Sequence, residues 1–199
     1  MEIFPICLAG FAGHGIPFFT WPTLTLNNAS VVNTNSVFGL GGGRVNGILT
    51  INGRCVWTGG IMGSGSGAIT FGTNATLLFD GTGGVDYPLV GNVTNAGTIY
   101  LQNGNLQIYE ANLFNLSGAL LDIQSDVSIY LVLNGEIENQ GVVRKSGGTG
   151  TTVINPVFDN SGTLDIQTGG VNLNGGGSDS GTILTETGTA IIFGGGEFV

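Results

Sequence analysis

A phrase in which an asparagine stands two residues before a glycine returns along the second half of the chain. It occurs as Asn95-Ala96-Gly97, as Asn139-Gln140-Gly141 and as Asn160-Ser161-Gly162. With two looser copies the glycines fall at positions 97, 118, 141, 162 and 181, so successive copies are 19 to 23 residues apart. A nearly fixed period of this size is typical of stacked structural units. The sequence therefore predicts a repeat protein.

The residues between the phrases indicate strands. The 38 glycines have no three-residue period, which excludes collagen, and they separate short β-branched runs that are too short for ordinary helices. A β-sandwich and a parallel solenoid could both contain such strands. Because like residues return to like positions, stacked coils are favoured. We predict an all-β fold, a right-handed parallel β-helix with about 20–23 residues per coil.

The repeated phrase is predicted to form a corner of each coil. Asparagine side chains stacked from coil to coil can hydrogen-bond to one another, and Asn and Gly both tolerate left-handed backbone angles. In the copy at Gly118, Leu116 takes the asparagine slot and Asn115 lies one residue earlier, so we expect a local irregularity there. The predicted corner comprises Asn95, Gly97, Gly118, Asn139, Gly141, Asn160, Gly162, Asp179 and Gly181.

Strand alternation assigns the residues beside this corner to two sides of the coil wall. The outward positions give a column of Tyr100, Asp122, Arg144 and Asp165, provided that the coil of Asp122 carries one extra residue. This column is the candidate binding face. Its two aspartates could serve a polysaccharide-cleaving enzyme as acid and base, but an arginine between them is explained more simply by a salt-bridge ladder. No catalytic residue is therefore assigned.

Alternation also makes predictions about individual buried positions. Leu131, on the second strand of its coil, is expected to point inward. Lys145 falls at an inward position too, where an unpaired charge would be costly. We expect the Ser146-Gly147-Gly148 turn to begin early and to leave Lys145 in solvent.

Composition excludes several classes of function. Four basic residues against 13 acidic ones give a net charge of −9, so we expect no nucleic-acid partner. The apolar stretch over residues 3–19 is interrupted by Pro and Gly, so neither membrane insertion nor a convincing signal peptide is predicted. One histidine, His14, and two cysteines, Cys7 and Cys55, are too few for a structural zinc site. No metal and no cofactor are predicted, and a Cys7–Cys55 disulfide is left open.

The repeat divides the chain into two parts. Residues 1–45 do not carry it clearly and are expected to cap the first coil, because the end of a solenoid exposes core that must be covered. Residues 46–199 are expected to form the coils. Open coil ends with unpaired strand edges favour association end to end.

Several stretches resemble a known family. Trp57-Thr58-Gly59-Gly60, residues 143–152 and residues 158–177 are similar to the coils of bacterial filamentous-haemagglutinin-like adhesins and autotransporter passenger domains. The resemblance implies an extracellular or cell-surface location, a glycan or cell-surface ligand, and coils that continue past residue 199 in a longer protein. We expect a non-enzymatic structural or adhesive solenoid. A polysaccharide-active lyase or hydrolase and a carbohydrate-binding module are the alternatives.

Overall fold

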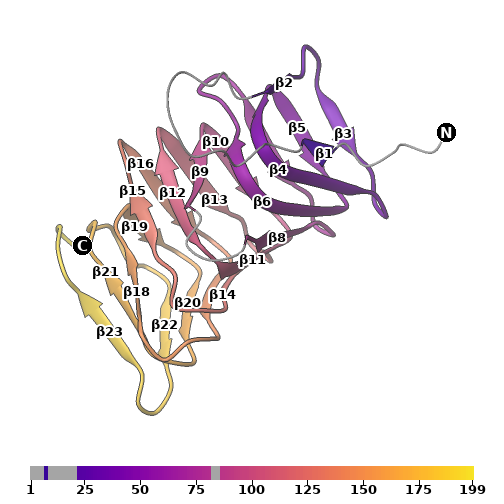
Figure 1. Ribbon diagram of the computed structural model, residues 1–199. Coiled ribbons are helices and arrows are strands. Elements are labelled where there is room, and N and C mark those ends of the chain that lie inside the picture. The colour runs from indigo at the N-terminus through magenta and orange to yellow at the C-terminus, as the bar shows by residue number, and fades with distance from the viewer. Residues whose placement is uncertain (1–6, 9–21, 82–85) are drawn as a thin grey trace, which may run out of the picture.

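The computed structural model describes residues 7–8, 22–81 and 86–199, and within these residues it contains strands and no helix. Parallel strands stack into a β-solenoid of about eight turns, and Figure 1 shows the coils following one another from the indigo N-terminal end to the yellow C-terminal end. The predicted all-β parallel solenoid is confirmed. No helix in the described residues is long and apolar enough to cross a membrane.

Each regular coil contributes one strand to each of three faces. Face I consists of β8 (Thr76–Asp80), β11 (Thr98–Asn103), β14 (Leu120–Ile123), β17 (Val142–Lys145), β20 (Thr163–Ile166) and β22 (Thr182–Thr185). Face II consists of β9 (Asp86–Val90), β12 (Asn105–Tyr109), β15 (Ile129–Leu131), β18 (Thr151–Ile154), β21 (Gly170–Leu173) and β23 (Ala190–Phe193). Face III consists of β3 (Ser30–Val32), β5 (Ile48–Ile51), β7 (Ala68–Phe71), β10 (Asn92–Asn95), β13 (Ala111–Asn115), β16 (Gly135–Asn139) and β19 (Val157–Asn160).

The remaining strands lie at the N-terminal end and join faces I and II into one 16-stranded sheet. They are β1 (Cys7–Leu8), β2 (Thr23–Thr25), β4 (Val37–Asn46) and β6 (Arg54–Met62). The first part of β6 pairs with β8 of face I, and Met62 at its end pairs with Leu89 of face II. The two long strands β4 and β6 therefore run without a break across the corner between faces I and II. In the later coils one strand ends at this corner and another begins.

Coil length varies around the predicted value. Equivalent asparagines of face III are separated by 20, 24 and 21 residues along the chain, and the last step, to Asp179, is 19 residues. The extra residues lie in the turns, because the strands of face III pair in parallel, partner for partner. Turn length can vary in this way without moving the inward columns out of register.

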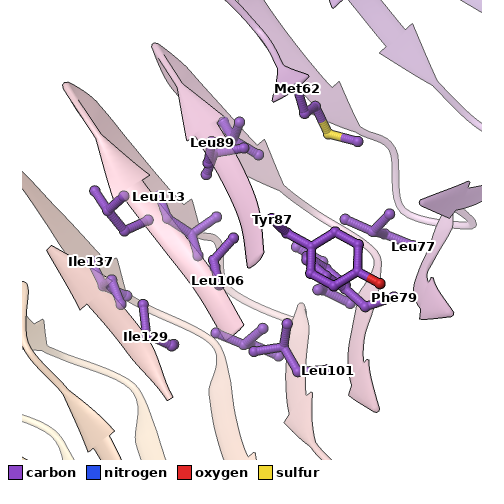
Figure 2. Close-up of a cluster of buried hydrophobic side chains, with 14 of the residues drawn as sticks. Met62, Leu77, Phe79, Tyr87, Leu89, Leu101, Leu106, Leu113, Ile129 and Ile137 are labelled. Atoms are coloured by element: carbon purple, nitrogen blue, oxygen red, sulfur yellow. The ribbon is translucent and has the colours of Figure 1, made fainter. Parts of the chain in front are cut away.

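The interior is a continuous apolar core made by alternate residues of all three faces. Figure 2 shows side chains such as Leu101 of face I, Leu106 of face II and Leu113 of face III in one buried cluster. Near the N-terminal end three aromatic rings fill it: Trp57 lies 5.1 Å from both Phe79 and Tyr87, and the last two are 4.8 Å apart, centroid to centroid. Burial of this apolar surface is the main force that holds the coils together.

Coil stacking begins before the predicted boundary at residue 45. Strand β4 runs across that boundary, Thr23–Thr25 pairs with Arg44–Asn46, and Ser30–Val32 pairs with Leu49–Ile51. The described residues from Thr23 onward thus belong to the same stack as the later coils. The predicted capping role concerns mainly residues 1–6 and 9–21, which lie outside the described residues, as does His14.

Candidate functional site

The predicted corner is a buried ladder of asparagine side chains between faces III and I. Asn95 Nδ2 donates to Asn115 Oδ1 at 2.8 Å, and Asn115 Nδ2 donates to Asn139 Oδ1 at 2.8 Å. Asn139 Nδ2 donates to Asn160 Oδ1 at 2.7 Å, and Asn160 Nδ2 donates to Asp179 Oδ1 at 2.8 Å. All four asparagines are buried. Each amide donates toward the C-terminal end, so the ladder has one direction and ends on a carboxylate.

The ladder corrects the prediction for the coil of Gly118. Asn115, and not Leu116, occupies the asparagine slot, in register with Asn95 and Asn139. The additional residues form a turn in which Ala119 N donates to Leu116 O at 2.9 Å, and Gly118 has a φ of 84° there. The irregularity therefore lies in the turn after Asn115 and leaves the asparagine ladder continuous.

The glycines of the corner are needed for space more than for a left-handed backbone. Of the five predicted corner glycines, Gly118 alone has a positive φ, and a Cβ added to it would meet nothing within 4 Å. At Gly141, by contrast, a Cβ would lie 2.5 Å from both Ala119 O and Leu116 O. The predicted reason, tolerance of left-handed angles, is wrong for Gly141; the preceding coil passes too close for any side chain.

The candidate binding face lies on face I, where the structure stacks Tyr100, Asp122, Arg144 and Asp165 on consecutive strands in register. Arg144 Nε donates to Asp165 Oδ2 at 2.9 Å. Asp122 is buried and accepts hydrogen bonds from Ser146 Oγ and Gln124 Nε2, both at 2.7 Å. The expected salt-bridge ladder therefore has one rung, Arg144–Asp165, because Asp122 is held by neutral side chains.

The rest of face I continues this pattern of internal bonding. Gln102 Nε2 donates to Gln124 Oε1 at 2.8 Å, and Gln167 Nε2 donates to Asp165 Oδ2 at 2.8 Å. An open depression of about 350 Å³ lies beside this network. It is lined by Arg54, Thr76, Leu78, Tyr100, Gln102 and Gln124. Most polar groups of the column thus satisfy one another and do not converge on a shared point.

Lys145 is buried, which corrects the expectation that it lies in solvent. Strand β17 includes it, its side chain is 0% exposed, and its Nζ donates to Gly147 O at 2.9 Å and Ser125 O at 3.2 Å. Nζ also pairs with Asp126 Oδ1 at 3.2 Å. This hydrogen bond from Lys145 holds the pKa of the Asp126 carboxyl below its usual range, helped by a bond from Gly150 N. The ammonium therefore ties together two neighbouring turns.

Face III carries an acidic group that the sequence analysis missed. Glu138 and Asp159 are direct partners on adjacent strands, and Glu136 lies on the same strand as Glu138. Burial, and then the charges of Glu138 and Asp159, raise the pKa of Glu136. Asn112 Nδ2 donates to Glu136 Oε1 at 3.0 Å, and Ser178 donates to Asp159 Oδ1 through both N and Oγ. In the described residues no group of His, Cys, Asp and Glu side chains is arranged to hold a metal ion.

Cys55 is a free thiol within the core. Burial raises its pKa, which keeps the sulfur protonated and unreactive. Strand β1 contains Cys7, whose side chain lies outside the described residues.

The two ends of the solenoid are apolar. At the C-terminal end Ile183, Ile191 and Phe198 are partly buried against the core, and the inward Phe193 is 53% exposed. The exposed Leu184 and Ile192 lie at outward positions, in register with Asp165 and Asn172. At the N-terminal end a hollow of about 170 Å³ is lined mainly by apolar side chains, among them Leu24, Leu26 and Phe38. Among the residues that the structure describes, both ends therefore carry core-like side chains.

Comparison of the chain with protein-family models, with curated proteins and with solved structures finds no match. The class that the fold defines is that of the parallel β-solenoid repeat proteins.

Proposed function

We propose that the chain is a non-enzymatic, structural or adhesive β-solenoid that acts outside the cell or at its surface and joins end to end with further copies. The observation that carries this proposal is the apolar C-terminal coil. The extracellular location is supported by the resemblance of the coils to those of exported bacterial surface proteins.

The strand edges of the C-terminal coil are ready for pairing. Within the described residues β22 pairs with β20 alone and β23 pairs with β21 alone. In β22 the amides of Thr182 and its i+2 neighbours point into the stack, since Thr182 N donates to Gly162 O at 2.9 Å and Glu186 N to Ile166 O at 3.1 Å. By alternation the Thr185 N–H points away from β20. A further strand could accept this bond.

This edge lacks the devices that usually prevent pairing. Exposed edges in soluble proteins are protected by charged residues, proline or a bulge. Strands β22 and β23 contain no charged residue and no proline. A second copy that docks its apolar N-terminal hollow here would cover apolar surface on both sides of the joint.

The contacts of face I favour a structural role over catalysis. An acid–base pair must reach the bond that it cleaves, whereas Asp122 is buried against Ser146 and Gln124, and Asp165 is paired with Arg144. Both carboxylates have structural partners. This arrangement supports a non-enzymatic solenoid.

The test is to place charge on the two edge strands. Thr185→Lys with Ile192→Lys puts a cation on each edge of the last coil, and the matched control, Thr151→Lys with Thr73→Lys, puts the same charge on exposed positions farther from that end. We expect the parent chain and the control to form linear assemblies as concentration rises, seen by light scattering and electron microscopy. The edge variant should remain monomeric. A parent chain that stays monomeric across the concentration range, or an edge variant that assembles like the control, would refute the proposal.

A further inference from the structure

One coil of the solenoid carries an apolar projection on its side. The step from Asn115 to Asn139 is 24 residues, against 21 for the next step. After β15 the chain leaves the sheet through Leu131, Val132 and Leu133, which are between 37% and 45% exposed. Leu131, which was predicted to point inward, pairs in register with the buried Ile108 but is 37% exposed at the end of its strand. Consecutive exposed apolar residues in a loop are unfavourable in solution unless they have a function.

Two tyrosines lie beside this projection. Tyr109 ends β12 and is 41% exposed, and Tyr130 lies on the neighbouring strand β15 and is 39% exposed. Val132 N donates to Ile108 O at 2.9 Å, which continues the pairing of β12 with the projection and brings Val132 beside Tyr109. We call Tyr109, Tyr130, Leu131, Val132 and Leu133 the tyrosine patch.

Polar side chains border the tyrosine patch at fixed positions. Gln107 is the direct partner of Tyr130 across the strand pair. Asp86 accepts hydrogen bonds from Gln107 Nε2 at 2.7 Å and from Asn105 Nδ2 at 3.2 Å. These bonds fix the Gln107 carboxamide, and its oxygen has no hydrogen-bond partner among the described residues. An oriented acceptor therefore stands next to an exposed aromatic ring.

We propose that the tyrosine patch and Gln107 form a binding site for a neutral glycan. The C–H face of a sugar ring packs on an aromatic ring, while its hydroxyl groups donate to and accept from carboxamide and phenol groups. Strands β9, β12 and β15 contain a single charged residue, Asp86, and no cation. This charge favours uncharged sugars over uronates or sulfated chains. Neighbouring strands are about 4.8 Å apart, so a glycan along the solenoid axis would meet Gln107 and then Tyr130.

A second copy of the chain fits this surface less well. Glu110 follows Tyr109, and Glu136 lies just beyond the projection. An isologous contact through the tyrosine patch would bring the same acidic flanks of two copies together, and such like-charge contact is costly. An uncharged glycan avoids this repulsion. The inference deepens the adhesive role proposed above and rests on it, but the site is separate from the C-terminal edge, so the two can fail independently.

The test is affinity electrophoresis of the chain in gels that contain one polysaccharide each: hydroxyethylcellulose, laminarin, mannan, galactan or glycol chitin, with polygalacturonate as the charged comparison. We expect retardation by at least one neutral polysaccharide. Tyr109→Ala and Tyr130→Ala should each weaken that binding about tenfold, while Tyr100→Ala, the matched change on face I, should not weaken it. Unchanged melting temperatures will show that the variants are folded.

Three outcomes would overturn the proposal. The first is the absence of retardation by every neutral polysaccharide. The second is a loss of binding in Tyr100→Ala with none in Tyr130→Ala, which would move the site to face I. The third is a parent dimer in solution that Val132→Lys dissociates, which would identify the tyrosine patch as a contact between copies.

Discussion

The direction of the asparagine ladder can be tested by one exchange of amide for carboxylate. In Asn139→Asp the side chain can still accept the hydrogen bond from Asn115 Nδ2, but it can no longer donate to Asn160 Oδ1 or to Thr163 O, which are 2.7 and 3.1 Å from Asn139 Nδ2. The buried carboxylate would then face two oxygen atoms. The two lost bonds and the unsatisfied acceptors together cost about 4 kcal/mol of unfolding free energy.

The matched control is the reverse exchange at the end of the same ladder. Asp179→Asn keeps an oxygen that accepts from Asn160 Nδ2 at 2.8 Å and from Gly181 N at 3.2 Å, and position 179 is exposed. We expect the control to change the free energy by less than about 1 kcal/mol, since no bond is lost. For a chain of this size the difference corresponds to roughly 10 °C in melting temperature, which circular dichroism will measure. Equal melting temperatures for the two variants would show that the donor-to-acceptor direction of the ladder does not contribute to stability.

Two further changes test individual groups. Lys145→Met keeps the buried volume but removes the ammonium that binds Gly147 O, Ser125 O and Asp126. We expect the free energy of unfolding, measured by chemical denaturation, to fall by about 3 kcal/mol. An unchanged denaturation midpoint would show that these bonds are dispensable. Glu136→Gln concerns a carboxyl whose pKa is raised in the folded state, so its contribution to stability is present at acidic pH and is lost as the pH rises through the raised pKa. The variant should be more stable than the parent at neutral pH, by at most about 1 kcal/mol because Glu136 is only partly buried. It should show no gain near about pH 3, and a gain that does not depend on pH would contradict this reasoning.

The sequence predicted those parts of the fold that depend on period and alternation. Each inward column needs only apolar residues that return once per coil, and Val143 and Leu164 follow one another in register in the structure as predicted. In the coil between Ile99 and Val143, however, Leu121 and not the predicted Leu120 takes the inward position, because that coil has extra residues in its turn. The outward partners Tyr100 and Asp122 could be aligned in the same way once an extra residue was allowed. Local pattern is sufficient here because parallel strands stack each position on its own equivalent.

The parts that could not be predicted depend on contacts between turns of different length. The partners of Lys145, Ser125 O and Asp126, lie 20 and 19 residues earlier in the chain, and no pattern around Lys145 reveals them. Counting back from Gly118 assigns Leu116 to the asparagine position. In the structure the extra residues of this coil lie between Asn115 and Gly118, so Asn115 occupies that position. Exposure of Leu131 likewise depends on where its strand ends. Each of these errors concerns a turn.

The one-way ladder also has a mechanical consequence for any joint between two molecules. The column that holds asparagine in the later coils holds Phe71, Ile51 and Val32 in the first ones. At the C-terminal end residues 197–199 stack on residues 177–179, with Asp179 N donating to Val199 O at 3.0 Å. A second molecule stacked in register beyond them would bring Val32, whose side chain has no donor or acceptor, to the joint. Such a seam would lack the cross-coil bond that every later coil possesses. Under tension a filament of this protein would part between subunits while the coils of each subunit remain wound.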